Sequence, residues 1–172
     1  MNDGVQPRPG DQAKVSVRVA VPRPEAWRIF TEEIDQWWRR GLKYRVAGSR
    51  RGIVHLEPGL GGRLFESFET KQGTEKVVQT GEVIGWEPPE RLLLRWRNVN
   101  FKKDESTEVE VHMADAAGGS ATLVTVIHRG WSEIRPDHPA RHELPVPAFV
   151  RMMGLWWGEL MTSLRMHAER SE

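Results

Sequence analysis

Cysteine is absent from this chain of 172 residues, and its positive and negative charges almost cancel. Without cysteine, the chain has no disulfide bonds, no thiolate metal ligands and no cysteine nucleophile. The 25 lysines and arginines against 24 acidic residues give a net charge of +1, so no overall field attracts the chain to nucleic acid. We therefore expect neither a disulfide-stabilised fold nor a nucleic-acid-binding protein.

Long apolar runs are also missing. No segment approaches the ~20 apolar residues of a membrane-spanning helix, and the N-terminus lacks the apolar stretch of a signal peptide. Residues 1–12 are rich in proline, glycine and polar side chains, which predicts a disordered leader. We expect a single domain over residues 13–170, in a cytoplasmic protein that does not bind membranes.

Alternating apolar and polar side chains predict most of the secondary structure. Residues 14–21 alternate in this way, which is typical of a half-buried β-strand. Trp27, Phe30 and Ile34 then recur at helical spacing and predict two short helices. Six more segments of strand character follow, separated by turn-forming residues: 52–57, 63–69, 75–86, 91–97, 107–115 and 121–129. Their close spacing predicts consecutive antiparallel hairpins.

The last predicted element is a long helix over residues 146–168. Phe149, Met152, Trp156, Leu160 and Leu164 recur at helical spacing, and the middle of the segment is apolar on nearly all sides. Such a helix needs to be buried. Strands bounded by helices indicate an α+β fold, in which a curved seven-stranded antiparallel sheet surrounds this helix.

The segment PGLGGR at residues 58–63 raises the question of a phosphate-binding loop. Such a loop requires a helix directly after it, because the helix N-terminus contributes amides that bind the anion. Here the residues after Gly62 alternate like a strand, and the lysine and hydroxyl residues of the phosphate-binding motif are missing. We therefore expect a hairpin turn with a positive φ at one or two of the glycines.

Several segments together resemble the START-like (SRPBCC) superfamily, and most of all its branch of activator-of-heat-shock-protein-90-ATPase homologues. They are VSVRVAVPRPEAWRIFTEEIDQWW, HLEPGLGGRLFE, GEVIGWEPPERLLLRW and HRGW. The resemblance spans residues 15–164 and implies the helix-grip fold, with two short helices after the first strand and a cavity between sheet and C-terminal helix. Members include lipid and hormone binders, polyketide cyclases and co-chaperone domains, so the fold alone does not determine the function.

Eight tryptophans against one tyrosine are the most informative part of the composition. We expect the large apolar candidates to converge between sheet and helix, where they form either an ordinary core or an apolar ligand pocket. Neighbouring helical residues point about 100° apart, so Trp156 and Trp157 are not expected to face one partner. The candidates are Trp37, Trp38, Phe65, Phe68, Trp96, Trp131, Met153, Trp156 and Trp157.

Three polar residues complete the candidate ligand-binding set. Glu82 and Arg95 lie within predicted strands, where they either pair inside the cavity or belong to the solvated face. His128 ends a strand and either reaches the cavity as a donor or proton carrier, or is satisfied by a neighbouring strand. His138 and His142 lie four residues apart, but the prolines around them favour a solvated loop over a metal site.

A basic cluster, Arg39, Arg40, Lys43, Arg45, Arg50 and Arg51, is interpreted as mostly a solvated loop, with an anion or nucleic-acid site as the alternative. No nucleophile with a matching base stands out, so no catalytic residue, metal or cofactor is assigned.

The sequence therefore predicts a domain that binds a small apolar or aromatic molecule, and it favours binding over catalysis. Three alternatives stay open. The first is a co-chaperone-like module that binds a chaperone or another protein, and the second is an enzyme of the cyclase or dehydratase type. In the third, the chain's own side chains fill the cavity. Monomer and homodimer are both compatible with the sequence.

Overall fold

The computed structural model describes residues 12–47, 51–97, 106–131 and 146–170. Its elements are β1 (Gln12–Val19), α1 (Arg23–Glu32), α2 (Ile34–Trp37), β2 (Gly52–Leu56), β3 (Arg63–Glu69), β4 (Glu75–Glu87), β5 (Arg91–Trp96), β6 (Thr107–Ala116), the short turn η1 (Ala117–Gly119), β7 (Ala121–Arg129) and α3 (Val146–Arg170). The predicted order of strands and helices is confirmed, and the predicted strand and C-terminal helix boundaries differ by two residues or fewer. Gln12, which was assigned to the leader, belongs to β1.

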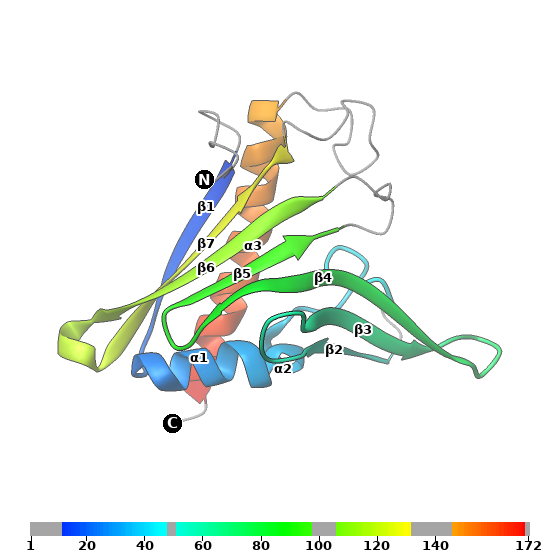
Figure 1. Cartoon of the computed structure of the whole chain (residues 1–172), viewed down its shortest axis with the longest axis horizontal. Coiled ribbons are helices and arrows are strands. Elements are labelled where there is room, and N and C mark those ends of the chain that lie inside the picture. The colour runs from blue at the N-terminus through cyan, green and yellow to red at the C-terminus, as the bar shows by residue number, and fades with distance from the viewer. Residues whose placement is uncertain (1–11, 48–50, 98–105, 132–145, 171–172) are drawn as a thin grey trace.

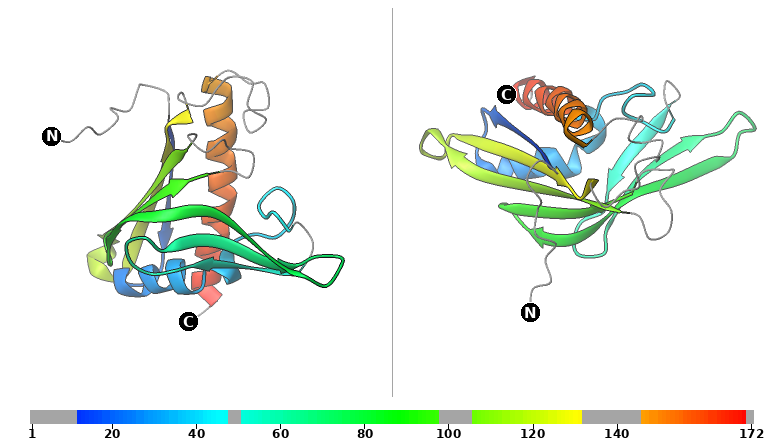
Figure 2. Two further views of the ribbon diagram at one scale, coloured as in Figure 1. Left: turned by 45° about the vertical axis from the view of Figure 1, so that its right-hand side comes forward. Right: turned by 90° about the horizontal axis from the view of Figure 1, so that it is seen from above.

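The seven strands form one antiparallel sheet in the order β1-β7-β6-β5-β4-β3-β2. The sheet is curved, α3 runs along its inner face, and α1 and α2 lie across one end of it (Figure 1). Seen from above, α3 occupies one side of the sheet, and the β3–β4 hairpin extends well beyond it (Figure 2). The predicted helix-grip architecture is confirmed.

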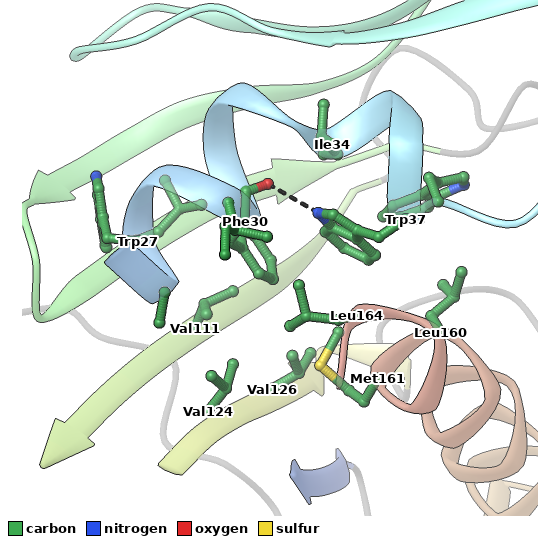
Figure 3. Packing of buried hydrophobic residues seen from close by; sticks show 14 of the residues in the cluster. Trp27, Phe30, Ile34, Trp37, Val111, Val124, Val126, Leu160, Met161 and Leu164 are labelled. Atoms are coloured by element: carbon green, nitrogen blue, oxygen red, sulfur yellow. Dashed lines mark hydrogen bonds between the residues drawn. The ribbon is translucent and has the colours of Figure 1, made fainter. Parts of the chain in front are cut away.

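The inner face of the sheet and the three helices share one hydrophobic core. In this core Trp27, Phe30 and Trp37 from α1 and α2 lie close to Leu160, Met161 and Leu164 from α3, over the valines of β6 and β7 (Figure 3). All of these side chains are buried. The strand alternation explains the arrangement, because every second residue of a strand points to the inner face of the sheet.

The outer face of the sheet carries a series of ion pairs. Arg95 lies 3.3 Å from Glu82, and both side chains are about half exposed, at 49% and 44%. Arg129 continues the series with Glu108 at 3.1 Å. The interpretation of Glu82 and Arg95 as cavity residues is therefore wrong. They alternate with the inward-facing Val83, Leu94 and Trp96, which places them on the opposite, solvated face.

The glycine-rich segment is a hairpin loop between β2 and β3, as predicted. Gly59 and Gly61 have φ angles of 86° and 81°, which side chains other than glycine rarely adopt. The loop is hydrogen-bonded to β4, since the Gly61 N–H donates to the Val83 carbonyl at 2.9 Å and the Val83 N–H donates to Gly62 at 2.7 Å. The Gly62 N–H donates to the Gly59 carbonyl at 3.1 Å. These amides are therefore engaged within the protein.

Candidate functional site

Five tryptophans from three parts of the fold meet between α2, β5 and α3, and we call Trp37, Trp38, Trp96, Trp156 and Trp157 the tryptophan cluster. Trp38 lies at its centre, with ring centroids 5.4 Å from Trp37, 6.1 Å from Trp96 and 5.9 Å from both α3 tryptophans. The Trp37 indole N–H donates to the Phe30 carbonyl at 3.2 Å (Figure 3). The predicted convergence of these residues is confirmed, and their rings occupy the space between sheet and helix.

The two adjacent tryptophans of α3 differ in exposure and in hydrogen bonding. Trp156 is half-buried, stacks on Tyr44 at 5.9 Å and donates its N–H to the Lys43 carbonyl at 2.8 Å. Trp157 is 2% exposed and donates to His128 instead. Both rings nevertheless contact Trp38, so the expectation that they could not face one partner is wrong. The Trp38 ring is large and lies between the two, so each of them contacts it from a different side.

His128 is fully buried, and all its hydrogen-bonding capacity is used. Its Nδ1 accepts the Trp157 indole N–H at 3.1 Å, so its Nε2 carries the hydrogen and donates to the Thr107 hydroxyl at 2.8 Å. Burial lowers the pKa of His128 from its ordinary 6.5 to about 3. The imidazole is therefore neutral and held in one tautomer. It is satisfied by side chains of β6 and α3, and we assign it no role as proton carrier.

A second, smaller apolar cluster lies beside His128. The Trp131 ring is 4.6 Å from both His128 and Phe149, and Trp131 and Phe149 are each 1% exposed. Met153 packs against this cluster and against the main core. Trp131 and Met153, both predicted to contact ligand, are thus packed against other side chains of the protein.

The two phenylalanines of β3 point in opposite directions. Phe68 lies on the inner face and is 8% exposed. Phe65 lies on the outer face, where its ring stacks on His55 at 4.5 Å and the Arg63 guanidinium lies 4.6 Å from its centroid. The prediction that Phe65 faces the space between sheet and helix is wrong, because it alternates with the buried Leu64 and Glu66.

Arg45 is the residue whose role the sequence analysis missed. It lies in the segment of residues 38–47 between α2 and β2, and its side chain is 0% exposed. The guanidinium donates to the Asp35 carboxylate at 2.7 Å and to the backbone carbonyls of four residues: Asp35, Trp38, Arg39 and Gly52. The expected solvated loop is therefore wrong for Arg45, although the side chains of Arg39, Arg40 and Lys43 are 48–58% exposed.

Glu66 attaches the same segment to the sheet. Glu66 is only 5% exposed. Its two carboxylate oxygens accept hydrogen bonds from the backbone N–H groups of Val46 and Ala47, each at 2.8 Å. A carboxylate at an inward-facing position between Leu64 and Phe68 was the signal available in the sequence. Together Arg45 and Glu66 fix the path of residues 45–47 over β2 and β3.

We expect Glu66→Gln to lower the free energy of unfolding by about 1–3 kcal/mol, because an amide –NH₂ cannot accept one of the two backbone N–H groups. Chemical denaturation measures the change. Glu69→Gln is the matched control, since Glu69 is exposed on the same strand, and its effect should stay within about 0.5 kcal/mol. Equal effects of the two substitutions would contradict the role given to Glu66.

Two grooves flank β3 on the surface of the described residues, away from the space between sheet and α3. The first, which we call the hairpin groove, has a volume of about 630 Å³ and is lined by Leu42, Val46, Ala47, Phe68, Thr70, Lys71, Gln72 and Lys76. The second has a volume of about 740 Å³ and is lined by Arg40, Arg51, Gly52, Ile53, Ser67, Phe68, Glu69, Gly73 and Glu75. Of the predicted ligand-binding residues, Phe68 lines these grooves and the others do not.

Two further expectations concern metals and membranes. Within residues 12–47, 51–97, 106–131 and 146–170, no three histidine, aspartate or glutamate side chains are placed to bind a metal ion. His138 and His142 lie outside the described residues. None of the helices in the described part is long and apolar enough to cross a membrane.

Solved structures with the same architecture come from several bacteria. Protein NE0264 from Nitrosomonas europaea is 15% identical, with a TM-score of 0.62 and coverage of 98% of this chain and 100% of that one. A protein from Rhodobacter sphaeroides is 20% identical, with a TM-score of 0.61 and coverage of 97% and 99%. DynU16 is 22% identical, with a TM-score of 0.60, and the match covers 94% of this chain but 48% of DynU16. These similarities show the shared fold.

No curated protein matches the sequence. A protein-family model does match: residues 20–167 fit the family described as Activator of Hsp90 ATPase homolog 1-like protein. This match covers most of the chain, and it includes the helix pair, the strands that line both grooves and nearly all of α3. The resemblance noted in the sequence is thereby confirmed, and the chain belongs to the AHSA1 family of START-like proteins.

Proposed function

We propose that this protein binds a small apolar or aromatic molecule in the hairpin groove. The observation that carries the proposal is the exposure of Leu42, which is 86% accessible although it borders a groove with Val46, Ala47 and Phe68. Covering an exposed apolar side chain of this size with a ligand is favourable, because apolar surface is removed from water. A groove of about 630 Å³ also lies within the usual range of small-molecule sites.

The groove has a rigid wall, which favours binding. Val46 and Ala47 are attached to Glu66 through their backbone N–H groups. Arg45, directly before them, binds four backbone carbonyls around α2 and β2. A wall that is already ordered loses little conformational freedom when a ligand binds.

The tryptophan cluster supports the groove without forming a pocket itself. Trp38 donates its indole N–H to the Tyr44 carbonyl at 3.1 Å, and Trp156 donates to Lys43 at 2.8 Å. The Trp156 bond holds the segment of residues 38–47 against α3, and the Trp38 bond fixes the path of the chain within the segment. The site proposed here is therefore the hairpin groove, and not the space between sheet and helix that was expected from the sequence.

The similarity to DynU16 is compatible with this proposal. DynU16 is described as a putative protein in the dynemicin biosynthetic locus. A biosynthetic locus suits a small-molecule ligand better than a chaperone partner.

Binding of N-phenyl-1-naphthylamine, a neutral apolar dye that fluoresces when shielded from water, tests the proposal. We expect saturable binding at one site per chain. Leu42→Ser should weaken binding about fivefold, because roughly 1 kcal/mol of apolar burial is lost. Leu42 is exposed in the free protein, so the substitution should leave the thermal midpoint nearly unchanged.

Leu60→Ser is the control, since Leu60 is 74% exposed but lies in the loop between β2 and β3, outside the groove. Its dye affinity should equal that of the unchanged protein. Absence of saturable binding, or equal affinity of the Leu42 and Leu60 variants, would contradict the proposal. The predicted protein-interaction module would then be the better hypothesis, with Leu42 and Val46 as contact residues.

A further inference from the structure

The hairpin groove combines an apolar floor with a positively charged rim. Its apolar lining comes from Leu42, Val46, Ala47 and Phe68, and its polar lining comes from the β3–β4 turn and the start of β4. The only charged groups among these lining residues are the ammonium groups of Lys71 and Lys76. A molecule lying in the groove would therefore meet apolar surface at one end and positive charge at the other.

The strand register separates positive from negative charge at the end of this hairpin. Lys76 lies directly opposite Phe68, and both point to the inner face. Glu69 lies directly opposite Glu75, so these two carboxylates share the outer face. Like charges placed opposite each other destabilise a hairpin, so its stability does not explain this arrangement. The consequence is a groove whose own face is cationic.

Neither lysine is neutralised within the described residues, where Lys71 and Lys76 form no ion pair. The nearby carboxylate on the inner face, Glu66, is buried and accepts the N–H groups of Val46 and Ala47. On the outer face, by contrast, Arg63, Arg91, Arg95 and Arg129 all pair with glutamates. Both ammonium groups of the groove thus remain available to an anion.

We propose that the ligand of the hairpin groove is an anionic amphiphile: an apolar chain or ring with a carboxylate at one end. The apolar part covers Leu42 and Val46, and the carboxylate lies between Lys71 and Lys76. This inference rests on the proposed function, because it specifies the chemistry of the same site. The charge contribution is modest, since water and salt screen an exposed ion pair.

Decanoate and decan-1-ol test the inference as a matched pair that differs at the head group. Each is titrated against protein carrying N-phenyl-1-naphthylamine, and displacement of the dye gives its affinity. We expect decanoate to bind about three to ten times more tightly than decan-1-ol at low salt. This advantage should largely vanish at 1 M salt, where the screening length falls to about 3 Å.

Two variants test whether the preference for decanoate arises in the groove. The double variant Lys71→Gln, Lys76→Gln should abolish the preference for decanoate over decan-1-ol. Lys14→Gln is the control, because Lys14 is an exposed lysine on β1 that does not line the groove, and it should retain the preference.

The outcomes separate this inference from the proposed function. If the dye binds in a Leu42-dependent manner but decanoate is no better than decan-1-ol, the anionic ligand is refuted and the groove remains a binding site. The same holds if the preference survives the double substitution. If the dye binds without dependence on Leu42, or does not bind, both proposals fail.

Discussion

Arg45→Met should lower the free energy of unfolding by about 3–5 kcal/mol, because it breaks a buried ion pair by removing one partner. The guanidinium is fully buried and bridges the Asp35 carboxylate and four backbone carbonyls. Methionine fills much of the volume but removes the five hydrogen bonds of the guanidinium, and buried acceptors that are left without a donor are costly. Chemical denaturation monitored by tryptophan fluorescence measures the loss.

Two companion variants show whether the hydrogen bonds or the charge account for this loss. Arg45→Lys keeps the charge but offers three donors in place of five, so about half of the loss should remain. Arg95→Met removes an arginine from a half-exposed ion pair with Glu82 and should cost less than about 1 kcal/mol. A similar loss at both arginines would show that Arg45 does not hold the segment of residues 38–47 in place.

The stability of the protein should fall as the pH drops below neutrality, because His128 is buried as a neutral imidazole. Its pKa is lowered by burial from 6.5 to about 3, so the unfolded chain takes up a proton that the folded protein rejects. The stabilisation is complete above the unfolded value and is lost as the pH falls from about 6.5 toward 3. Between pH 7.5 and 5 the unfolding equilibrium constant should rise about 30-fold, or about 2 kcal/mol, from this residue alone.

Denaturation at pH 7.5 and 5 of the unchanged protein and of His128→Gln isolates this contribution. Glutamine can accept from Trp157 and donate to Thr107, but it does not titrate. The pH range ends at 5 because carboxylates contribute below it: the pKa of Glu57, for example, lies below its ordinary 4.5 owing to the hydrogen bond from Arg63. The variant should be less stable at pH 7.5. Between pH 7.5 and 5, its unfolding equilibrium constant should rise by a factor about 30 times smaller than that of the unchanged protein. An unchanged pH dependence would contradict a neutral His128.

The architecture could be predicted from the sequence because the alternation of side chains repeats in every strand. In β5, Leu92, Leu94 and Trp96 alternate with outward-facing residues, and the helical spacing of Leu160 and Leu164 identifies the buried side of α3. These patterns are local, and each strand and helix shows its own. Much of the tryptophan cluster followed from the same patterns, since Trp37, Trp96 and Trp157 lie on the inward sides of their elements.

The candidate site could not be predicted in the same way. The hairpin groove depends on the path of residues 42–47, which have no periodic pattern and are held by Arg45 and Glu66 across many residues of sequence. Phe65 and Phe68 must point to opposite faces because they lie three residues apart in one strand, but which of the two faces borders the groove depends on how the strand packs. The cationic inner rim follows from the pairing of Phe68 with Lys76, which composition alone does not reveal.

The hydrogen bonds that hold β2 to α2 also block the free edge of the sheet. β2 is an edge strand, and such a strand usually offers unpaired amides and carbonyls to another chain. Here the Val54 N–H donates to the Asp35 carboxylate, and the Gly52 carbonyl accepts from Arg40 and Arg45. Intermolecular β-pairing at this edge is therefore blocked in the native state. Loss of Arg45 would weaken the fold and also remove one of the two donors that cover the Gly52 carbonyl at this edge.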